Sequence, residues 1–181
     1  MKWMIASDLH GSAAFCQAML RRFQEENADR LLLLGDLLYH GPRNDLPEGY
    51  APKEVIAQLN AVRERLLCIR GNCDAEVDQM VLQFPILAEY AVLPYQDRLI
   101  YASHGHIWNP QHLPPLCGGD VFLFGHTHIP FCEKVGGVLC LNPGSVSLPK
   151  QDSPRSYMTF RNGTFEWKAL DTGATYRTAL L

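Results

Sequence analysis

The first half of the chain alternates short apolar runs with segments in which apolar residues recur at helical spacing. The apolar runs predict strands over 2–7, 30–34 and 66–69. The segments between them predict helices over 12–27, capped by Ser12, over about 52–63, with Pro52 at its start, and over about 75–83, ending before Pro85. This succession of strand, loop and helix is typical of an α/β fold.

The second half of the chain is mostly strand. Residues 89–93 and 98–103 flank a turn and predict an antiparallel pair, and further strands are expected over 121–124, 138–142, 156–160 and 164–170. The last two are joined by Asn162-Gly163, a strong hairpin signal. Helical crossovers followed by hairpins predict two mixed β-sheets packed as a sandwich with helices outside. No linker-like segment divides the chain, so we expect a single domain over 1–181.

Five polar motifs follow predicted strands directly. They are Asp8-Leu9-His10, Gly35-Asp36, Gly71-Asn72-Cys73-Asp74, His104-Gly105-His106 and Gly125-His126-Thr127-His128. Because open α/β folds bind ligands at the carboxyl ends of their strands, we expect these side chains to gather at one edge. Carboxylate, imidazole and amide groups bind divalent metal ions, and a pair of ions needs one shared carboxylate. The motifs therefore predict a two-metal hydrolytic centre.

Some members of this set have simpler interpretations. An aspartate such as Asp8 or Asp36 is often a helix cap, and Asp74, directly before a predicted helix, is interpreted as one. The two histidines of 126–128 have few structural reasons to occur together and are the most specific part of the set. His40 lies in the loop that follows Asp36 and is expected to face the substrate, whereas His112 is interpreted as a surface residue.

Composition excludes several classes of partner. With a formal charge of −3 and a pI near 6.1, the 181-residue chain has no general attraction to nucleic acid or to an anionic membrane. No apolar run approaches the roughly 18 residues of a spanning helix, and the first apolar stretch is too short for a signal peptide, so a cytoplasmic protein is expected. The six cysteines form no C-x-x-C pair, which argues against disulfides and thiolate zinc sites.

Taken in order, the five motifs resemble the pattern of the calcineurin-like metallophosphoesterase superfamily. The loop 39–44 and the run Asn142-Pro143-Gly144-Ser145 resemble a compact bacterial phosphodiesterase branch of it. The resemblance implies an α/β/β/α fold and two divalent metal ions, commonly Mn²⁺, with iron and zinc also suited to these donors. It assigns the first ion to Asp8, His10, Asp36 and His128 and the second to Asp36, Asn72, His104 and His126. Asp36 would bridge the ions, and self-association is also implied.

By the same resemblance, a hydroxide that bridges the ions attacks a small-molecule phosphodiester in line, without a covalent intermediate. The catalytic residues would be Asp36, Asn72 and His104, and those next to the substrate His40, Cys73 and His106. Most relatives have a histidine where this chain has Cys73, and a cysteine lacks the reach and charge to protonate a leaving group. We therefore expect a preference for activated diesters and weak turnover of monoesters and 2′,3′-cyclic nucleotides.

Three other functions compete with this interpretation. A scaffold protein of the same fold would bind metal and a partner but have little catalytic activity. A mononuclear metal protein would use one cluster and leave the other residues as caps and core histidines. A cysteine hydrolase would use Cys73 as a nucleophilic thiol, but this leaves the aspartates and the His126-Thr127-His128 motif unexplained.

Overall fold

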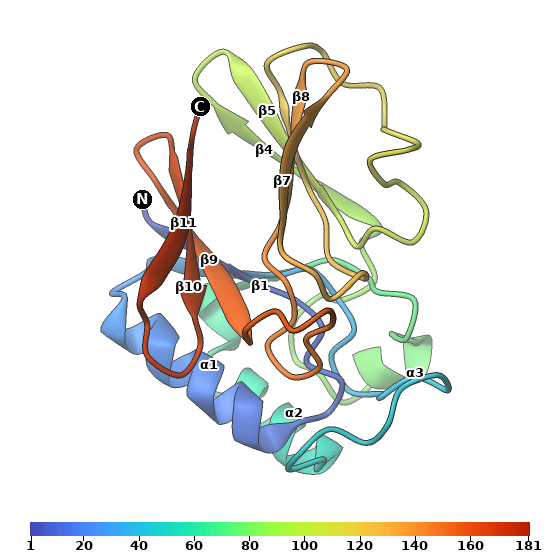
Figure 1. Cartoon of the computed structure of the whole chain (residues 1–181). Coiled ribbons are helices and arrows are strands. Elements are labelled where there is room, and N and C mark those ends of the chain that lie inside the picture. Colours follow the sequence, from blue (N-terminus) through green and yellow to red (C-terminus); the bar gives the residue numbers. More distant parts are fainter.

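Two β-sheets form the body of the chain, whose computed structural model describes all residues, 1–181 (Figure 1). The strands of the first sheet are β1 (Trp3–Ala6), β2 (Arg30–Leu33), β3 (Leu66–Cys68), β9 (Ser156–Arg161), β10 (Thr164–Ala169) and β11 (Thr175–Leu180). Those of the second sheet are β4 (Tyr90–Tyr95), β5 (Arg98–Ser103), β6 (Val121–Leu123), β7 (Phe131–Val135) and β8 (Val138–Asn142). The orders are β11-β10-β9-β1-β2-β3 and β4-β5-β6-β8-β7.

Both sheets are mixed, as predicted. In the first sheet, β1, β2 and β3 are parallel neighbours, while β9 and β10 run antiparallel to their partners. In the second sheet, β5, β6 and β8 are parallel neighbours, with β4 and β7 added antiparallel at the edges. The carboxyl ends of three parallel strands in one sheet and of two in the other are followed by the loops that carry the polar motifs.

The helices are shorter than their sequence patterns suggested. They are α1 (Ala13–Glu25), α2 (Pro52–Asn60), followed by the 3-10 turn η1 (Arg63–Arg65), and α3 (Glu76–Gln79). The Ser12 cap of α1 is confirmed, because its side chain accepts a hydrogen bond from the N–H of Phe15. The helix expected over 75–83 ends at Gln79, whose side chain binds the backbone of Leu82, Phe84 and Ile86 and so holds the chain in turns.

Alternate residues of the central strands divide the apolar core into two layers. Met4 and Leu31 pack on one side of the first sheet with helix residues such as Phe23. Ile5 and Leu32 point to the other side and pack against the second sheet. Because strand side chains alternate between faces, β1 and β2 must be apolar throughout, and a run of four leucines from Leu31 to Leu34 provides this. The doubly buried strands thus anchor the loops that follow them.

The outer faces of the two sheets are covered differently. Helices α1 and α2 lie along the first sheet (Figure 1). The outer face of the second sheet, around Phe122 and Phe124, is covered instead by the non-helical segment 104–119, through side chains such as Trp108, Leu113 and Leu116. This segment leaves the outer face of β4 and β5 open, where Tyr90, Val92 and Leu99 are exposed.

Two strands have no counterpart in the sequence predictions. β7 pairs with β8 across Gly136-Gly137, both with positive φ, which is a two-residue hairpin. β11 is an edge strand whose side chains are nearly all exposed, so no apolar alternation marks it. All six cysteines are free, which confirms the absence of disulfides. No helix of the chain is long and apolar enough to cross a membrane.

Glu26, at the end of α1, joins the helix layer to the first sheet. Its carboxylate accepts hydrogen bonds from Lys2 Nζ at 2.6 Å, Lys168 Nζ at 2.7 Å and the hydroxyl of buried Tyr157 at 2.8 Å. Burial opposes ionisation, but these three donors together lower the pKa of Glu26 below its ordinary value. The carboxylate therefore stabilises the folded state at neutral pH.

We predict that Glu26→Gln lowers the free energy of unfolding at pH 7 by about 1–3 kcal/mol, the usual contribution of hydrogen bonds to a charged group. Because the folded-state pKa is lowered, this stabilisation is present above the ordinary carboxyl pKa and is lost as the pH falls through the folded value. Urea unfolding at pH 7 and pH 4 checks this, with exposed Glu25→Gln as the control. A difference as large at pH 4 as at pH 7 would contradict the assignment.

Candidate metal centre

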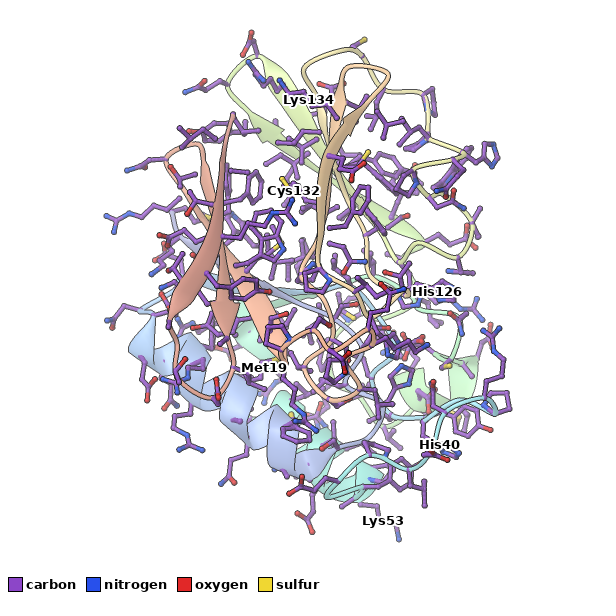
Figure 2. All side chains as sticks on the ribbon, viewed as in Figure 1. Met19, His40, Lys53, His126, Cys132 and Lys134 are labelled. Atoms are coloured by element: carbon purple, nitrogen blue, oxygen red, sulfur yellow. The ribbon has the colours of Figure 1, made fainter.

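The loops that carry the five polar motifs meet at one end of the two sheets. Asp8, Asp36 and Asn72 follow β1, β2 and β3, and His104 and His126 follow β5 and β6. The N–H of His126 donates to Asp8 Oδ2 at 3.1 Å and so joins the sheets. Figure 2 shows His126 at the level where the sheets approach one another. Residues separated by more than a hundred positions in the sequence therefore form one cluster.

Asp36 lies between two histidines of this cluster. Its Oδ2 is 3.6 Å from Nε2 of His10 and 3.4 Å from Nε2 of His104, and its Oδ1 accepts a hydrogen bond from the N–H of Cys73 at 2.8 Å. Potential ligand atoms gather on both sides of it, with His10 and Cys73 on one side and with His104 and His126 on the other. Asp36 thus belongs to two candidate groups of metal-ligand atoms.

Asp8 faces the other two histidines. Its Oδ1 is 3.7 Å from Nε2 of His10 and 3.4 Å from Nε2 of His128, it is fully buried, and it has no hydrogen-bond partner. A buried carboxylate oxygen without a partner is costly. A cation bound between Asp8, His10 and His128 would remove this cost, so the orphaned oxygen fits a metal site.

Three histidines are fixed in the same tautomer. Each has its Nδ1 within hydrogen-bond distance of a backbone carbonyl oxygen, which is that of Tyr39 for His10 (2.9 Å), Leu34 for His104 (2.6 Å) and Leu148 for His128 (2.6 Å). Because a carbonyl oxygen can only accept, each Nδ1 must carry the proton. The Nε2 of each neutral ring then presents a lone pair to the cluster, as in metal-binding histidines.

Acceptor atoms consequently face one another across the cluster. His10 Nε2 and His128 Nε2 are 3.1 Å apart, and His104 Nε2 is 3.1 Å from Asn72 Oδ1. Lone pairs at this distance, next to two carboxylates, repel one another unless positive charge lies between them. Nitrogen and oxygen donors in this arrangement suit divalent ions such as manganese, iron and zinc.

The pKa values of the buried groups also indicate that the cluster is stabilised by positive charge. Burial opposes the charged form of His104, yet the carboxylates of Asp36 and Asp8 raise its pKa to about 9. Burial likewise opposes ionisation of Asp8, but the neighbouring histidines hold its pKa well below the ordinary value. Burial and the charge of His104 lower the pKa of His126 to about 4, so this ring is neutral. A metal ion has to displace the proton of His104, and metal binding should strengthen as the pH rises.

Five members of the cluster have left-handed backbone conformations. The φ values are +60° for Asp8, +49° for His10, +57° for Asp36, +63° for His126 and +62° for His128. Such conformations are uncommon outside glycine, although aspartate and histidine adopt them more readily than most residues, and they concentrate at functional sites. They turn each side chain from the end of its strand toward the cluster.

Two glycines are required by the close approach of the loops. A Cβ atom on Gly71 would lie 2.1 Å from Asp36 Oδ1, and one on Gly125 would lie 2.0 Å from Ser7 Oγ. Any other residue at these positions would push the Asp36 loop or the Asp8 loop out of place. The glycines of the Gly-Asn and Gly-His motifs are therefore packing requirements of the cluster.

The interpretation of Asp74 as a helix cap is wrong. Ala75 is the N-cap residue of α3, and its N–H is bound by the side chain of Asp78. Asp74 is buried and accepts hydrogen bonds from three backbone N–H groups, those of Asp36 (2.8 Å), Leu37 (2.9 Å) and Gly71 (2.7 Å). It therefore fixes the backbone that carries the shared carboxylate.

A second supporting segment follows β8. The hydroxyls of Ser145 and Ser147 donate to the backbone oxygen of Asp8 at 2.9 and 2.8 Å, and the amide of Asn142 donates to the backbone oxygen of Gly125 at 2.7 Å. In the sequence this segment contributes only to the family resemblance, and no role was predicted for it. Its signal was a run of small polar residues directly after an apolar strand.

The cluster opens into a pocket of about 400 Å³ whose lining residues are almost all polar, and we call it the polar pocket. It is lined by Asp36, Asn72 and three histidines of the cluster, and its outer walls include Arg43, Asn44 and Lys150; the three histidines are His10, His126 and His128. Sequence patterns assigned no role to Arg43, Asn44 or Lys150, because exposed polar and basic residues carry no distinctive pattern. Arg43 and Lys150 place positive charge beside the cluster, where an anion would bind.

The three remaining histidines lie in different surroundings. The ring of His106 is 5.4 Å from that of His104 and so borders the cluster without joining a ligand group. His40 packs against Tyr39 and Tyr50 and does not line the polar pocket, although residues 41–44 of its loop do. His112 is exposed, as expected for a surface residue.

Cys73 is half-buried at the edge of the polar pocket. Burial, together with the nearby carboxylate of Asp36, raises the pKa of its thiol to about 12. The thiol is therefore neutral at physiological pH and supplies no thiolate. This removes support from the cysteine-hydrolase alternative.

Comparison with known proteins identifies close relatives. The sequence profile of the calcineurin-like phosphoesterase superfamily domain matches residues 1–164. The chain is 46% identical over 171 residues to phosphodiesterase YfcE of Escherichia coli (strain K12), which covers 94% of this chain and 93% of that protein. The solved structure of YfcE, a phosphoesterase from E. coli, superposes with a TM-score of 0.96 at 43% identity and covers 99% of each chain.

A more distant structure shares the fold alone. The Vps29 protein of Entamoeba histolytica, solved in complex with Zn²⁺, superposes with a TM-score of 0.60 at 21% identity and covers 99% of each chain. The two mixed sheets with few helices thus match an architecture found both in a phosphodiesterase and in Vps29.

We predict that Asp74→Ala lowers the stability of the metal-free protein by about 2–5 kcal/mol, because three buried N–H groups lose their acceptor. The same change should weaken Mn²⁺ binding about 10–100-fold, the usual cost of losing a group that orients a ligand. Urea unfolding and a Mn²⁺ competition titration measure the two effects, with exposed Asp97→Ala as the control. A folded Asp74→Ala protein that binds Mn²⁺ as tightly as the wild type would contradict this role.

Proposed function

This chain belongs to the calcineurin-like phosphoesterase superfamily, and from that premise we propose that it hydrolyses phosphodiesters with two divalent metal ions held by its five polar loops. The observation that carries the proposal is the convergence of acceptor atoms, above all the orphaned Asp8 Oδ1 and the facing Nε2 atoms of His10 and His128. The identity of 46% to a phosphodiesterase supports the class of reaction.

The proposed ligands divide into two sets that share Asp36. Asp8, His10, Asp36 and His128 would hold the first ion, and Asp36, Asn72, His104 and His126 the second. The short contacts of Asp36 Oδ2 to both His10 and His104 support this division. Manganese is the proposed ion, because carboxylate, amide and imidazole donors without thiolate suit it, and iron or zinc would also fit.

When bound, the ions would lower the pKa of a water molecule and neutralise negative charge on the phosphoryl oxygens. The ligand sets contain only two carboxylates, Asp8 and Asp36, so the loaded site keeps excess positive charge for an anionic substrate. Arg43 and Lys150 extend this positive charge along the polar pocket. The chain thus attracts and orients a small phosphodiester, and water attacks it without a covalent enzyme intermediate.

Cys73 determines the proposed substrate range. It lies beside Asp36 at the edge of the polar pocket, and its neutral thiol is a poor proton donor to a departing alkoxide. We therefore propose that the enzyme prefers diesters with good leaving groups, which depart without a proton. Monoesters and 2′,3′-cyclic nucleotides, whose leaving groups need one, are proposed as poor substrates.

A scaffold role is the second candidate function. It is favoured by the apolar side chains exposed on the outer face of the second sheet, Tyr90, Val92, Leu99 and Ile107. Exposed apolar patches often mark partner surfaces. A scaffold has no need of a complete ligand set, however, and every position of the two proposed sets holds a suitable donor.

We predict that Asp36→Ala loses both ions and turnover, because the shared carboxylate belongs to both ligand sets. Metal content, measured by plasma mass spectrometry, should fall from about two ions per chain to fewer than one. Turnover of bis(4-nitrophenyl) phosphate with added Mn²⁺ should fall by more than about a hundredfold, beyond the cost of losing a supporting residue. Asp152→Ala, on an exposed turn, is the control, and retained turnover in Asp36→Ala would rule out the shared ligand.

We predict that Cys73→His gains activity on substrates with poor leaving groups. The kcat/KM for glycerol 2-phosphate and 2′,3′-cyclic AMP, whose leaving groups are alkoxides, should rise at least about tenfold, a conservative share of the usual contribution of a general acid. Exposed Cys117→His serves as the matched control. If Cys73→His keeps its metal but gains nothing on either substrate, Cys73 does not limit the substrate range.

A further inference from the structure

The outer face of β4 and β5 forms an apolar pocket beside the metal centre. β4 is an edge strand that pairs with β5. On their outer face, Tyr90 lies opposite Ser103 and Val92 lies opposite Tyr101. The covering segment 104–119 packs over the neighbouring strands and borders this face through Trp108 and Leu116, but it leaves Tyr90 and Val92 exposed. A cavity of about 430 Å³ lies between the open face and the side chain of Trp108. We call it the tyrosine pocket.

The tyrosine pocket borders the metal centre. His104, a proposed ligand of the second ion, and His106 form part of its wall. The ring of His106 lies 6.2 Å from that of His126, which lines the polar pocket. The two pockets share no lining residue, so they approach the proposed ions from different directions.

Its walls suit a flat ring that carries hydrogen-bond donors. Tyr90 and Tyr101 are stacked with their ring centroids 5.0 Å apart and their planes within 11° of parallel. The Ser103 side chain is 3% exposed, and its hydroxyl has no hydrogen-bond partner. Glu89 adds a carboxylate at the rim. Aromatic walls stack on flat rings, while a carboxylate accepts hydrogen bonds from ring N–H groups and repels anions.

We propose that the tyrosine pocket binds a nucleobase on the ester group that stays attached to the phosphate. The phosphate itself is excluded by Glu89 and by the apolar walls, and it goes to the ions and to Arg43 and Lys150 in the polar pocket. The leaving group lies on the side of Cys73, which lines the polar pocket. The retained ester group therefore points along His106 toward Tyr90 and Tyr101, and the substrates are phosphodiesters whose retained ester group is a nucleoside.

This inference rests on the proposed phosphodiesterase function, and its test separates the two. The Mn²⁺-loaded protein is assayed with thymidine 5′-(4-nitrophenyl phosphate) and with methyl 4-nitrophenyl phosphate. Both are alkyl aryl diesters with the same leaving group, so a difference between them reports the nucleoside alone. We expect kcat/KM to be at least about tenfold higher for the thymidine ester. This corresponds to about 1.4 kcal/mol, which is within the usual range for base stacking. The difference should lie mainly in KM.

Tyr90→Ala tests the pocket, because Tyr90 is 55% exposed on an edge strand and its truncation leaves the core intact. The preference for the thymidine ester should fall below about threefold. Tyr176→Ala removes a comparably exposed tyrosine, 43% exposed on β11 of the other sheet, and should keep the full preference. Equal kcat/KM for the two esters in the wild type, or a preference that survives Tyr90→Ala, would overturn the proposal.

Calorimetry gives a readout that does not depend on turnover. Thymidine 5′-monophosphate should bind the Mn²⁺-loaded protein about tenfold more tightly than methyl phosphate, and Tyr90→Ala should remove the difference. If neither ester is hydrolysed but this difference is present, the phosphodiesterase proposal fails and the tyrosine pocket stands. If Tyr90→Ala instead changes only the oligomeric state, measured by light scattering, the face is a protein interface and the tyrosine pocket is rejected.

Discussion

Hydrogen-bond acceptors held face to face need positive charge between them, and this requirement organises the end of the molecule where the two sheets meet. The Nε2 atoms of His10 and His128 are 3.1 Å apart, and two neutral rings have no proton to place between them, because both Nδ1 protons are bound to backbone carbonyls. The fully buried carboxylate of Asp8 lies against them. The arrangement is favourable only with positive charge in place, supplied by a proton or by a metal ion, so metal binding and the folding of these loops are coupled.

The rest of the fold holds these acceptors in position. The apolar strands β1 and β2, buried on both faces, end where the Asp8 and Asp36 loops begin, which fixes the start of these two loops within a rigid core. Left-handed conformations then turn the side chains inward, and their cost is offset by hydrogen bonds from outside the ligand set. Asp74 holds the Asp36 turn, and Ser145 and Ser147 hold the backbone of Asp8.

Sequence patterns predicted the parts of this structure that local chemistry determines. Periodicity located the buried strands and α1, and spacing located the polar loops, because both signals lie within a few residues. Asp74 was misread as a cap because its three partners come from two different loops and are visible only after folding. β11 was missed because an exposed edge strand needs no apolar alternation. Likewise, no local pattern shows that Tyr90 and Tyr101 stack beside the metal centre.

Anomalous X-ray diffraction from a crystal of the Mn²⁺-loaded protein tests the two-ion centre most directly. Two manganese peaks about 3.5–4 Å apart are expected, one on each side of Asp36 Oδ2, with Asp8 and His128 at one and Asn72, His104 and His126 at the other. A single peak at Asp8 and His128, with His104 left hydrogen-bonded to Asp36, would contradict the shared carboxylate and indicate a mononuclear metal protein.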